Sequence, residues 1–271
     1  MADERERWQE RIMKLYMSEP IAFHKAVALI PAHDEVISLR ETVQGIETLC
    51  SPADVARIVI ALSPYATNAC RREADLLACD CVPIPVTAIQ ERKGAMAKEL
   101  QQVLRAQSDA SHCLLWTADQ DAPPETAALM IEKAKKNPAA VVRLSRFLPG
   151  GGLPASKKGF VNLRDTVFAR LVCLLYRSKQ TDPHFGLAMF PIHDFLRFDL
   201  REKFMAFTLE YNLCFERIGT QFIELPLKQQ PRPEGRSNLS VMNKLRYFVP
   251  VIRLRFLPRR KIFKEGPHEQ T

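Results

Sequence analysis

The sequence predicts an α/β fold in which helices flank a mostly parallel β-sheet. Short apolar runs alternate with helical patterns along the first half of the chain, as strands and helices do in such folds. The runs are rich in Val, Ile, Leu and Ala without polar alternation, which is typical of parallel strands buried on both faces. With 271 residues, 46% of them hydrophobic, the chain is long enough to bury one large core.

The expected elements follow one another in a regular order. The expected strands are 26–30, 57–61, 81–86, 113–116, one that begins at Val141, and 222–226. The expected helices are 3–18, a stretch that ends near Cys50, 68–77, 93–107, 123–137, 160–176 and 207–218. Pro123 and Pro124 occupy a helix N-terminus, where proline is tolerated, and Gly219 suits a helix C-terminus. The loops that follow the first four strands are the expected ligand sites.

The chain is expected to divide into an N-terminal helix (1–24), one large domain (25–240) and a basic amphipathic C-terminal tail (241–271). Lys and Arg exceed Asp and Glu by 39 to 31, which gives a formal net charge of +8. Such an excess favours anionic partners such as nucleotide phosphates or an acidic membrane surface. Nucleic acid is not expected, because no nucleic-acid motif accompanies the basic residues.

The cysteines and the N-terminus indicate a cytoplasmic protein. The seven cysteines are odd in number, form no CxxC pair and mostly lie in apolar runs, where a free thiol packs as a small hydrophobe. That usage is typical of a reducing compartment. The charged N-terminus has no apolar signal region, and no stretch of the sequence is apolar for long enough to predict a membrane span.

Asp119-Gln120-Asp121 follows the expected strand at 113–116. Two carboxylates in one short loop can face a single hard cation, and oxygen ligands suit Mg²⁺ or Mn²⁺ shared with substrate phosphates. The alternative is a solvated turn whose aspartates cap the helix that begins near Pro124. The position after a strand favours the metal site.

Two further loops carry polar residues at strand ends. After the first strand, Pro31-Ala-His-Asp-Glu35 places an acidic pair where a base or ribose could bind, or these residues cap the next helix. After the third strand, Lys93 suits a phosphate and Gly94 permits close backbone approach. Alternatively, that segment is a solvated charge run.

In content and order these segments resemble the family 2 glycosyltransferases, which have a GT-A (Rossmann-like) fold. Segment 27–35 is similar to the family's opening strand and Pro-x-x-Asn-Glu loop, with Asp34 in place of asparagine. The other similar segments are Lys93-Gly94 with Ala97, the DxD segment 116–125, Leu144-Ser-Arg146 with Gly150-Gly151, 181–186, 224–226 and 232–237. The last three resemble motifs of the polyprenyl-phosphate or dolichyl-phosphate branch.

The resemblance implies transfer of a sugar, with inversion, from a UDP- or GDP-linked donor to a lipid-phosphate or saccharide acceptor. It implies that Asp119 and Asp121 bind the Mn²⁺ or Mg²⁺ that bridges the donor diphosphate. The donor-binding residues that it implies are Pro31, His33, Glu35, Ser63, Lys93, Asp119, Arg146, Arg232 and Ser237. Among these, the cations would contact phosphates of the donor or of a phosphorylated acceptor.

Asp182 and Glu210 are the candidates for the general base. A neutral hydroxyl acceptor needs a carboxylate to take its proton, whereas an acceptor phosphate is already ionised and needs none. The alternative for Glu210 is an ordinary residue on a helix surface.

One departure from the family pattern concerns the end of the second strand. The family has an aspartate there that contacts the base, whereas 58–65 contains none and Ser63 is its nearest equivalent. The departure leaves the identity of the nucleotide open. It also motivates a second hypothesis, a nucleotide-sugar-binding pseudoenzyme or interaction protein without catalysis.

The tail segment 244–261 interleaves aromatic and aliphatic residues with cations and holds no acid. Such a segment could lie against anionic lipid at the inner face of the membrane, a peripheral contact that suits a lipid-linked acceptor. Alternatively, its apolar side packs on the domain while its basic side chains reach solvent. Pro250 and Pro258 exclude one long helix here.

Overall fold

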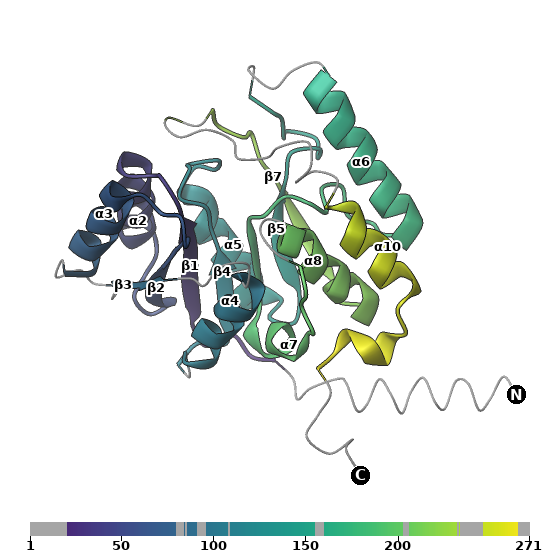
Figure 1. Ribbon diagram of the computed structural model, residues 1–271, viewed down its shortest axis with the longest axis horizontal. Helices are drawn as coiled ribbons and strands as arrows, with labels where there is room; N and C mark the ends of the chain where they lie inside the picture. The colour runs from purple at the N-terminus through teal and green to yellow at the C-terminus, as the bar shows by residue number, and fades with distance from the viewer. Residues whose placement is uncertain are drawn as a thin grey trace, which may run out of the picture.

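The computed structural model describes residues 21–79, 84, 86–90, 96–107, 109–154, 160–202, 206–231, 233 and 246–264. Figure 1 shows a central sheet with helices packed along it on both sides. The expected N-terminal helix 3–18 lies outside the described residues.

The described residues form a seven-stranded sheet in the order β3-β2-β1-β4-β6-β5-β7. The strands are β1 (Ala26–Ala32), β2 (Val55–Leu62), β3 (Val86–Gln90), β4 (His112–Leu115), β5 (Val141–Ser145), β6 (Ala188–Pro191) and β7 (Phe222–Pro226). β6 pairs antiparallel with β4 and β5, and the other pairs are parallel. β2 and β3 lie on one side of β1, and β4 lies on the other side. The strand order therefore reverses between β1 and β4, which is where ligands bind in such sheets.

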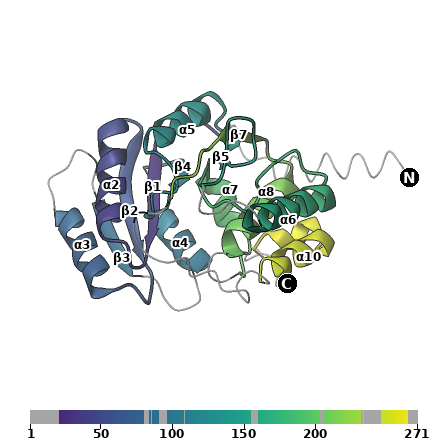
Figure 2. The same ribbon diagram turned by 90° about the horizontal axis from the view of Figure 1, so that it is seen from above.

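Helices cover both faces of this sheet. They are α2 (Ile37–Leu49), α3 (Asn68–Cys79), α4 (Met96–Arg105), α5 (Glu125–Lys136), α6 (Phe160–Tyr176), α7 (Ile192–Arg197), α8 (Ala206–Ile218), α10 (Phe248–Phe256) and the 3₁₀ helix η2 (Arg259–Ile262). α2, α3 and α5 pack into one hydrophobic cluster, and α4, α7, α8 and α10 pack into the other. Seen from above in Figure 2, α5 and α4 lie on opposite sides of β1 and β4.

The alternation of side chains along β1 explains the two clusters. Ala28 and Ile30 are buried in the cluster with α2 and α5, whereas Val27 and Leu29 are buried in the other, with Leu100 of α4. Successive side chains of a strand point to opposite faces, so a central strand between two helix layers needs apolar residues throughout. The α/β fold class predicted from these apolar runs is confirmed.

Two expectations about the strands need correction. The third strand was expected at 81–86, but β3 occupies Val86–Gln90 and pairs with the C-terminal half of β2. Of the expected range the structure describes only Ile84 and Val86, and Val86 begins β3. β6 and α7 were not expected from the sequence. β6 is only four residues long, too short to show a period of its own.

The C-terminal tail packs on the domain, as one of the two alternatives expected. Val251, Leu254 and Ile262 are buried in the cluster that contains α8. Pro250 lies in the first turn of α10 and Pro258 follows its end, so the prolines bound a short helix. Among the residues that the structure describes, no helix is both long and apolar enough to cross a membrane.

Candidate functional site

The loop after β4 holds Asp119 and Asp121 beside the point where the strand order reverses. The N–H of Trp116 donates to the carbonyl of Leu29 at 2.9 Å, which ties the start of this loop to β1. Each of the two aspartates is only 6% exposed. The pair therefore lies in a sheltered position at the carboxyl edge of the sheet, where a charge is screened less than on an open surface.

Helix α2 fixes the shape of this aspartate loop. Gln120, between the two aspartates, has a φ of +55°, a left-handed conformation that costs free energy for a residue with a side chain. Its amide nitrogen donates to Glu41 of α2. One turn further along α2, a Cβ added to Gly45 would lie 2.7 Å from Cβ of Pro124, at the start of α5. Only glycine therefore permits this close approach of the two helices.

The segment after β7 reaches across to Asp121. Nε2 of Gln229 donates to Oδ1 of Asp121 at 2.7 Å, and the N–H of Gln230 donates to the Asp121 carbonyl at 3.1 Å. Gln229 is itself buried, and its N–H donates to the carbonyl of Gly152 at 2.9 Å. A neutral amide orients a carboxylate without cancelling its charge. Gln229 therefore positions Asp121 and preserves the attraction of this carboxylate for a cation.

The loops after β1 and β2 lie side by side. The N–H of Thr67 donates to the carbonyl of His33 at 2.9 Å. Nδ1 of His33 lies 3.3 Å from Oγ of Ser63. The Glu35 carboxylate accepts the N–H groups of His33 and Asp34, at 2.7 and 3.1 Å. The structure thus brings together three of the residues expected to bind the nucleoside, His33, Glu35 and Ser63, and shows that Glu35 also closes its own turn.

A buried ion pair joins the loops after β5 and α6. Nε and Nη2 of Arg146 donate to the two carboxylate oxygens of Asp182 at 2.7 and 2.9 Å, and the Arg146 N–H donates to Oδ2 at 3.2 Å. Nη2 of Arg146 also lies 3.0 Å from Nε2 of His184. The Phe185 ring lies beneath the guanidinium, 4.7 Å from its carbon. Two-pronged pairing of this kind fixes both side chains in one geometry.

Glu224 of β7 hydrogen-bonds to the loop that carries Asp182. Its Oε2 accepts the N–H and the hydroxyl of Thr181 at 2.8 and 2.9 Å, and its Oε1 accepts the N–H of Asp182 at 3.2 Å. The Thr181 hydroxyl also hydrogen-bonds to Ser145 at the end of β5. Arg143, two residues earlier on β5, donates to the carbonyl of Phe185 at 2.8 Å. Segments 144–146, 181–186 and 224–226, which resemble family motifs, are therefore joined in one hydrogen-bonded network.

The pKa values in this network follow from burial and the Arg146 charge. Burial raises the pKa of Asp182, but the Arg146 guanidinium outweighs it, and the pKa lies below its usual range. Burial lowers the pKa of His184 to about 4, although Asp182 opposes this shift. His184 is therefore neutral at neutral pH. Its Nε2 accepts the hydrogen bond from Arg146, so its Nδ1 carries the proton, 3.5 Å from the Asp182 carboxylate.

These surroundings argue against both expected general bases. Asp182 is fully buried and paired with Arg146, so its carboxylate is a weak base that an acceptor does not reach. Glu210 is also fully buried, which corrects the alternative of a helix-surface residue. Its carboxylate accepts the N–H groups of Arg201 and Glu202 at 2.8 and 2.9 Å and pairs with Arg253 of α10. A general base must lie within hydrogen-bond reach of the proton that it takes.

The remaining expected site residues divide into two groups. Pro31 lies near the end of β1, paired with Ala61 of β2 at the same edge of the sheet as His33. Lys93, Arg232 and Ser237 lie outside the described residues.

The acidic pair has the chemistry of an incomplete cation site. Within the described part of the chain, no group of three or more His, Cys, Asp or Glu side chains is placed to hold a metal. Asp119 and Asp121 supply carboxylate oxygens, which are hard ligands. Mg²⁺ and Mn²⁺ are commonly held by one or two carboxylates together with substrate phosphates. The donor set therefore fits a cation that binds together with a diphosphate.

Two residues of this region escaped the sequence analysis. Gln229 carries no charge and belongs to no expected motif, so only its contact with Asp121 reveals it. His184 lies within the segment 181–186, two residues after Asp182, and that position was a usable signal.

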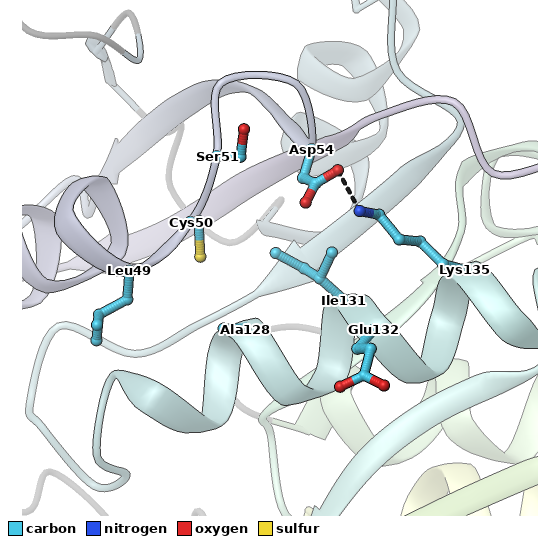
Figure 3. Close-up of a pocket in the computed structure, with 8 residues that line it drawn as sticks. All are labelled: Leu49, Cys50, Ser51, Asp54, Ala128, Ile131, Glu132 and Lys135. Carbon is cyan, nitrogen blue, oxygen red and sulfur yellow. Dashed lines mark ion pairs between the residues drawn. The ribbon is translucent and has the colours of Figure 1, made fainter.

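A cavity of about 230 Å³ lies elsewhere, between the end of α2 and the middle of α5 (Figure 3). Asp54, at its rim, pairs with Lys135 at 2.5 Å, and its carbonyl accepts the N–H of Ala26 at the start of β1. The cavity thus lies at the amino ends of the strands, opposite the aspartate loop. Burial raises the pKa of Cys50 in this cavity to about 11, so its thiol is protonated at neutral pH. The candidate functional site is therefore the one at the carboxyl edge of the sheet.

No protein-family model and no curated protein sequence matches the chain. Its fold is similar to that of glucosyl-3-phosphoglycerate synthase from Mycobacterium tuberculosis. In its complex with Mn²⁺, UDP and phosphoglyceric acid, that enzyme shares 12% sequence identity with this chain, and the two structures superpose with a TM-score of 0.65. The match covers 87% of this chain and 80% of that chain. Its structure with Mn²⁺, UDP-glucose and phosphoglyceric acid is 13% identical with a TM-score of 0.64, over 87% and 81%.

A third structure of the same enzyme, with Mg²⁺ and UDP, is 12% identical with a TM-score of 0.64, over 87% of this chain and 80% of that chain. At such identities the likeness shows the fold alone. That fold is the GT-A-like, mostly parallel sheet with flanking helices that the sequence predicted.

Proposed function

We propose that this chain is a divalent-metal-dependent glycosyltransferase that moves a sugar from a nucleotide-sugar to an acceptor. The observation that carries the proposal is the Asp119–Asp121 pair, which lies beyond β4 where the strand order reverses and is oriented by Gln229. The structure of the similar synthase contains Mn²⁺ and UDP-glucose. This likeness supports a nucleotide-sugar donor and a Mn²⁺ or Mg²⁺ cofactor for the present chain.

In this proposal Asp119 and Asp121 hold the cation. When bound, the cation stabilises the negative charge of the departing nucleoside diphosphate. Pro31, His33, Glu35 and Ser63, at the ends of β1 and β2, flank the base and ribose of a UDP- or GDP-linked donor. This placement supports a nucleoside bound on the β1–β2 side of the aspartate loop.

The proposed phosphate contacts come from cations. Lys93 and Arg232, with Ser237, remain candidates from the resemblance. Arg146 has a different role in our proposal: its guanidinium is buried and occupied by Asp182, so it fixes the shape of the loop after β5. A phosphate would have to displace Asp182 to bind it.

The acceptor oxygen forms a bond to the anomeric carbon of the sugar while the bond from that carbon to the diphosphate oxygen breaks, with inversion. Asp182 and Glu210 are both enclosed, and neither suits a hydroxyl acceptor that must lose a proton. A phosphate acceptor attacks with an oxygen that is already ionised. We therefore favour a lipid phosphate over a saccharide as the acceptor. The protein would then be cytoplasmic and bind the membrane peripherally.

The first test measures donor binding. Thermal unfolding is recorded with UDP-glucose, GDP-mannose, UDP and GDP, each with and without Mn²⁺. A ligand that binds only the folded state stabilises it, by about 2.7 kcal/mol when its concentration is a hundred times its Kd. The melting temperature therefore rises. We expect a shift that requires both nucleotide and Mn²⁺, and release of nucleoside diphosphate when a polyprenyl phosphate is added.

The matched variants are Asp121→Asn and Asp54→Asn. The same change is made at opposite edges of the sheet, and we expect only Asp121→Asn to remove the metal-dependent shift. Equal shifts in both variants would contradict the proposal.

A second candidate function is nucleotide-sugar binding without transfer. The observation that favours it is Ser63, which lies against His33 where the resembling family has an aspartate. Metal-dependent binding with no release of nucleoside diphosphate, for any donor with either acceptor class, would favour this candidate over the enzyme.

A further inference from the structure

Helix α6 exposes a long apolar stripe on the side that faces away from the sheet. Leu163, Val167, Leu171 and Leu174 follow one another at helical spacing and are all exposed, Leu174 to 77%. Residues three and four apart share one face of a helix. Large aliphatic side chains at every turn of an exposed face are unusual for a helix that meets only water.

Helix α10 continues this apolar surface. Phe248, Val249, Ile252 and Phe256 are exposed, Phe256 to 78%. Both figures show α10 lying beside α6 at the end of the molecule remote from α3. We call the exposed side chains of these two helices the α6–α10 face.

Direct contacts between α6 and α10 hold the two helices side by side. The ring of Phe168 in α6 lies 5.2 Å from that of Phe248, near the start of α10. The Tyr176 hydroxyl donates to the carbonyl of Val251 at 2.7 Å, and Nε of Arg255 donates to the carbonyl of Leu175 at 3.1 Å. The α6–α10 face is therefore one surface on a fixed scaffold.

Cations line the same face. Arg170 falls at helical spacing with the apolar stripe of α6, and Arg255 falls with that of α10. Arg177 follows the end of α6, and all three arginines are exposed. Arg259 and Lys261 are exposed just beyond the end of α10. Across segments 160–179 and 246–264 the sequence holds a single acid, Asp165, which pairs with Arg164. The face therefore combines exposed aliphatic and aromatic groups with an uncompensated positive charge.

We propose that the α6–α10 face docks on an anionic phospholipid surface. Leu, Ile and Phe side chains enter the boundary between head groups and acyl chains, while arginines extend their apolar stems and bind lipid phosphates. A second copy of the chain fits this face less well. In a two-fold dimer a patch meets itself, so the positive charges of this face would oppose one another.

This face adjoins the proposed active site. Phe168 of α6 packs edge-on against His184, 5.5 Å between ring centroids, and Asp165 is close enough for its charge to raise the pKa of Arg146. Docking through α6 and α10 therefore places the loop after β5 next to lipid head groups. The membrane contact stands without the proposed function; only the inference that the acceptor is reached from the lipid surface rests on it.

The test is co-sedimentation of the full-length chain with vesicles of phosphatidylcholine alone or mixed with phosphatidylglycerol. We expect binding to the anionic vesicles that weakens as salt is raised. The paired changes Leu171→Glu with Leu174→Glu, and Ile252→Glu with Phe256→Glu, should each lower the partition coefficient by at least about tenfold, because each removes two exposed apolar side chains that would enter the lipid. Arg170→Ala with Arg177→Ala should lower it by roughly tenfold or more.

Leu129→Glu is the matched control, since Leu129 is exposed to 52% on α5, on the other face of the sheet. It should bind vesicles like the unchanged chain, and circular dichroism should show that every variant is folded. Asp121→Asn should also bind vesicles normally, so that failure of the donor site and failure of the lipid face are told apart.

Three outcomes would overturn the lipid face. The unchanged chain could ignore anionic vesicles, or the arginine variant could lose binding while both glutamate pairs keep it. Alternatively, sedimentation velocity could show a dimer that the glutamate pairs dissociate, without vesicle binding, which would assign the face to a second copy.

Discussion

Asp121 and Asp182 are both sheltered aspartates from segments that resemble the same family, yet their neighbours differ. Asp121 accepts a hydrogen bond from the neutral amide of Gln229, whereas Asp182 is held by the Arg146 guanidinium. An amide orients a carboxylate and leaves its charge, whereas a paired guanidinium cancels it. The first aspartate is therefore suited to bind a ligand and the second to hold a loop.

This contrast is tested most strongly by Asp182→Asn. The substitution leaves the buried Arg146 without its counter-charge, and breaking a buried pair in this way costs about 3–5 kcal/mol of stability. Urea unfolding measures the change in the free energy of unfolding. Asp121→Asn, measured in parallel, should lose far less, and equal losses would show that both aspartates are structural.

Asp121→Asn should instead act on function. If the cation contributes several kcal/mol to stabilising the leaving group, its loss lowers the transfer rate by on the order of 100-fold or more. The measurement is release of nucleoside diphosphate at saturating Mn²⁺. A rate within a few fold of the unchanged chain would remove Asp121 from the proposed metal site.

Gln229→Ala removes the amide and keeps both carboxylates. Outer partners of metal ligands typically change metal affinity by about 10- to 100-fold when mutated. We expect a higher Mn²⁺ concentration for half-maximal donor binding and a small change in melting temperature. Gln229→Glu cannot donate a hydrogen bond to Asp121 and adds a third carboxylate beside it. Mn²⁺ dependence equal to that of the unchanged chain in this variant would identify negative charge, not orientation by the amide, as the requirement.

The smallest expected effect at neutral pH is a pH dependence that comes from His184 and grows as the pH falls. Its pKa falls from 6.5 to about 4 on folding, so the unfolded chain binds more protons between these values. Stability from this group is complete above pH 6.5 and is lost as the pH falls towards 4. The lowered pKa of Asp182 adds a loss at still lower pH. His184→Gln should flatten the slope of unfolding free energy between pH 6.5 and 4, and an unchanged slope would contradict the assignment.

Much of the fold could be predicted because its central strands are buried on both faces. Such strands are continuous apolar runs, and β1 and β2 were found within a few residues of their ends. β6 carries no such signal, because four residues set between two antiparallel neighbours look like any short apolar stretch.

The candidate site could be predicted only in part, for a physical reason. A carboxylate pair after a strand is visible in the sequence, as at Asp119 and Asp121. The partner of a carboxylate is not visible, because Arg146 meets Asp182 across 36 positions and Gln229 meets Asp121 across 108. These pairings depend on the order of strands in the sheet. Asp182 therefore looked like a base until its partner was known.

The position of Gln229 also has a consequence for protein synthesis. The N-terminus of the chain leaves the ribosome first, so β1, β4 and the aspartate loop emerge long before β7. Among the described strands, β7 pairs only with β5, and the segment that follows it carries Gln229 to Asp121. A nascent chain therefore displays the two carboxylates before the amide that orients one of them exists. The proposed cation site is therefore complete only when the last strand of the sheet has left the ribosome.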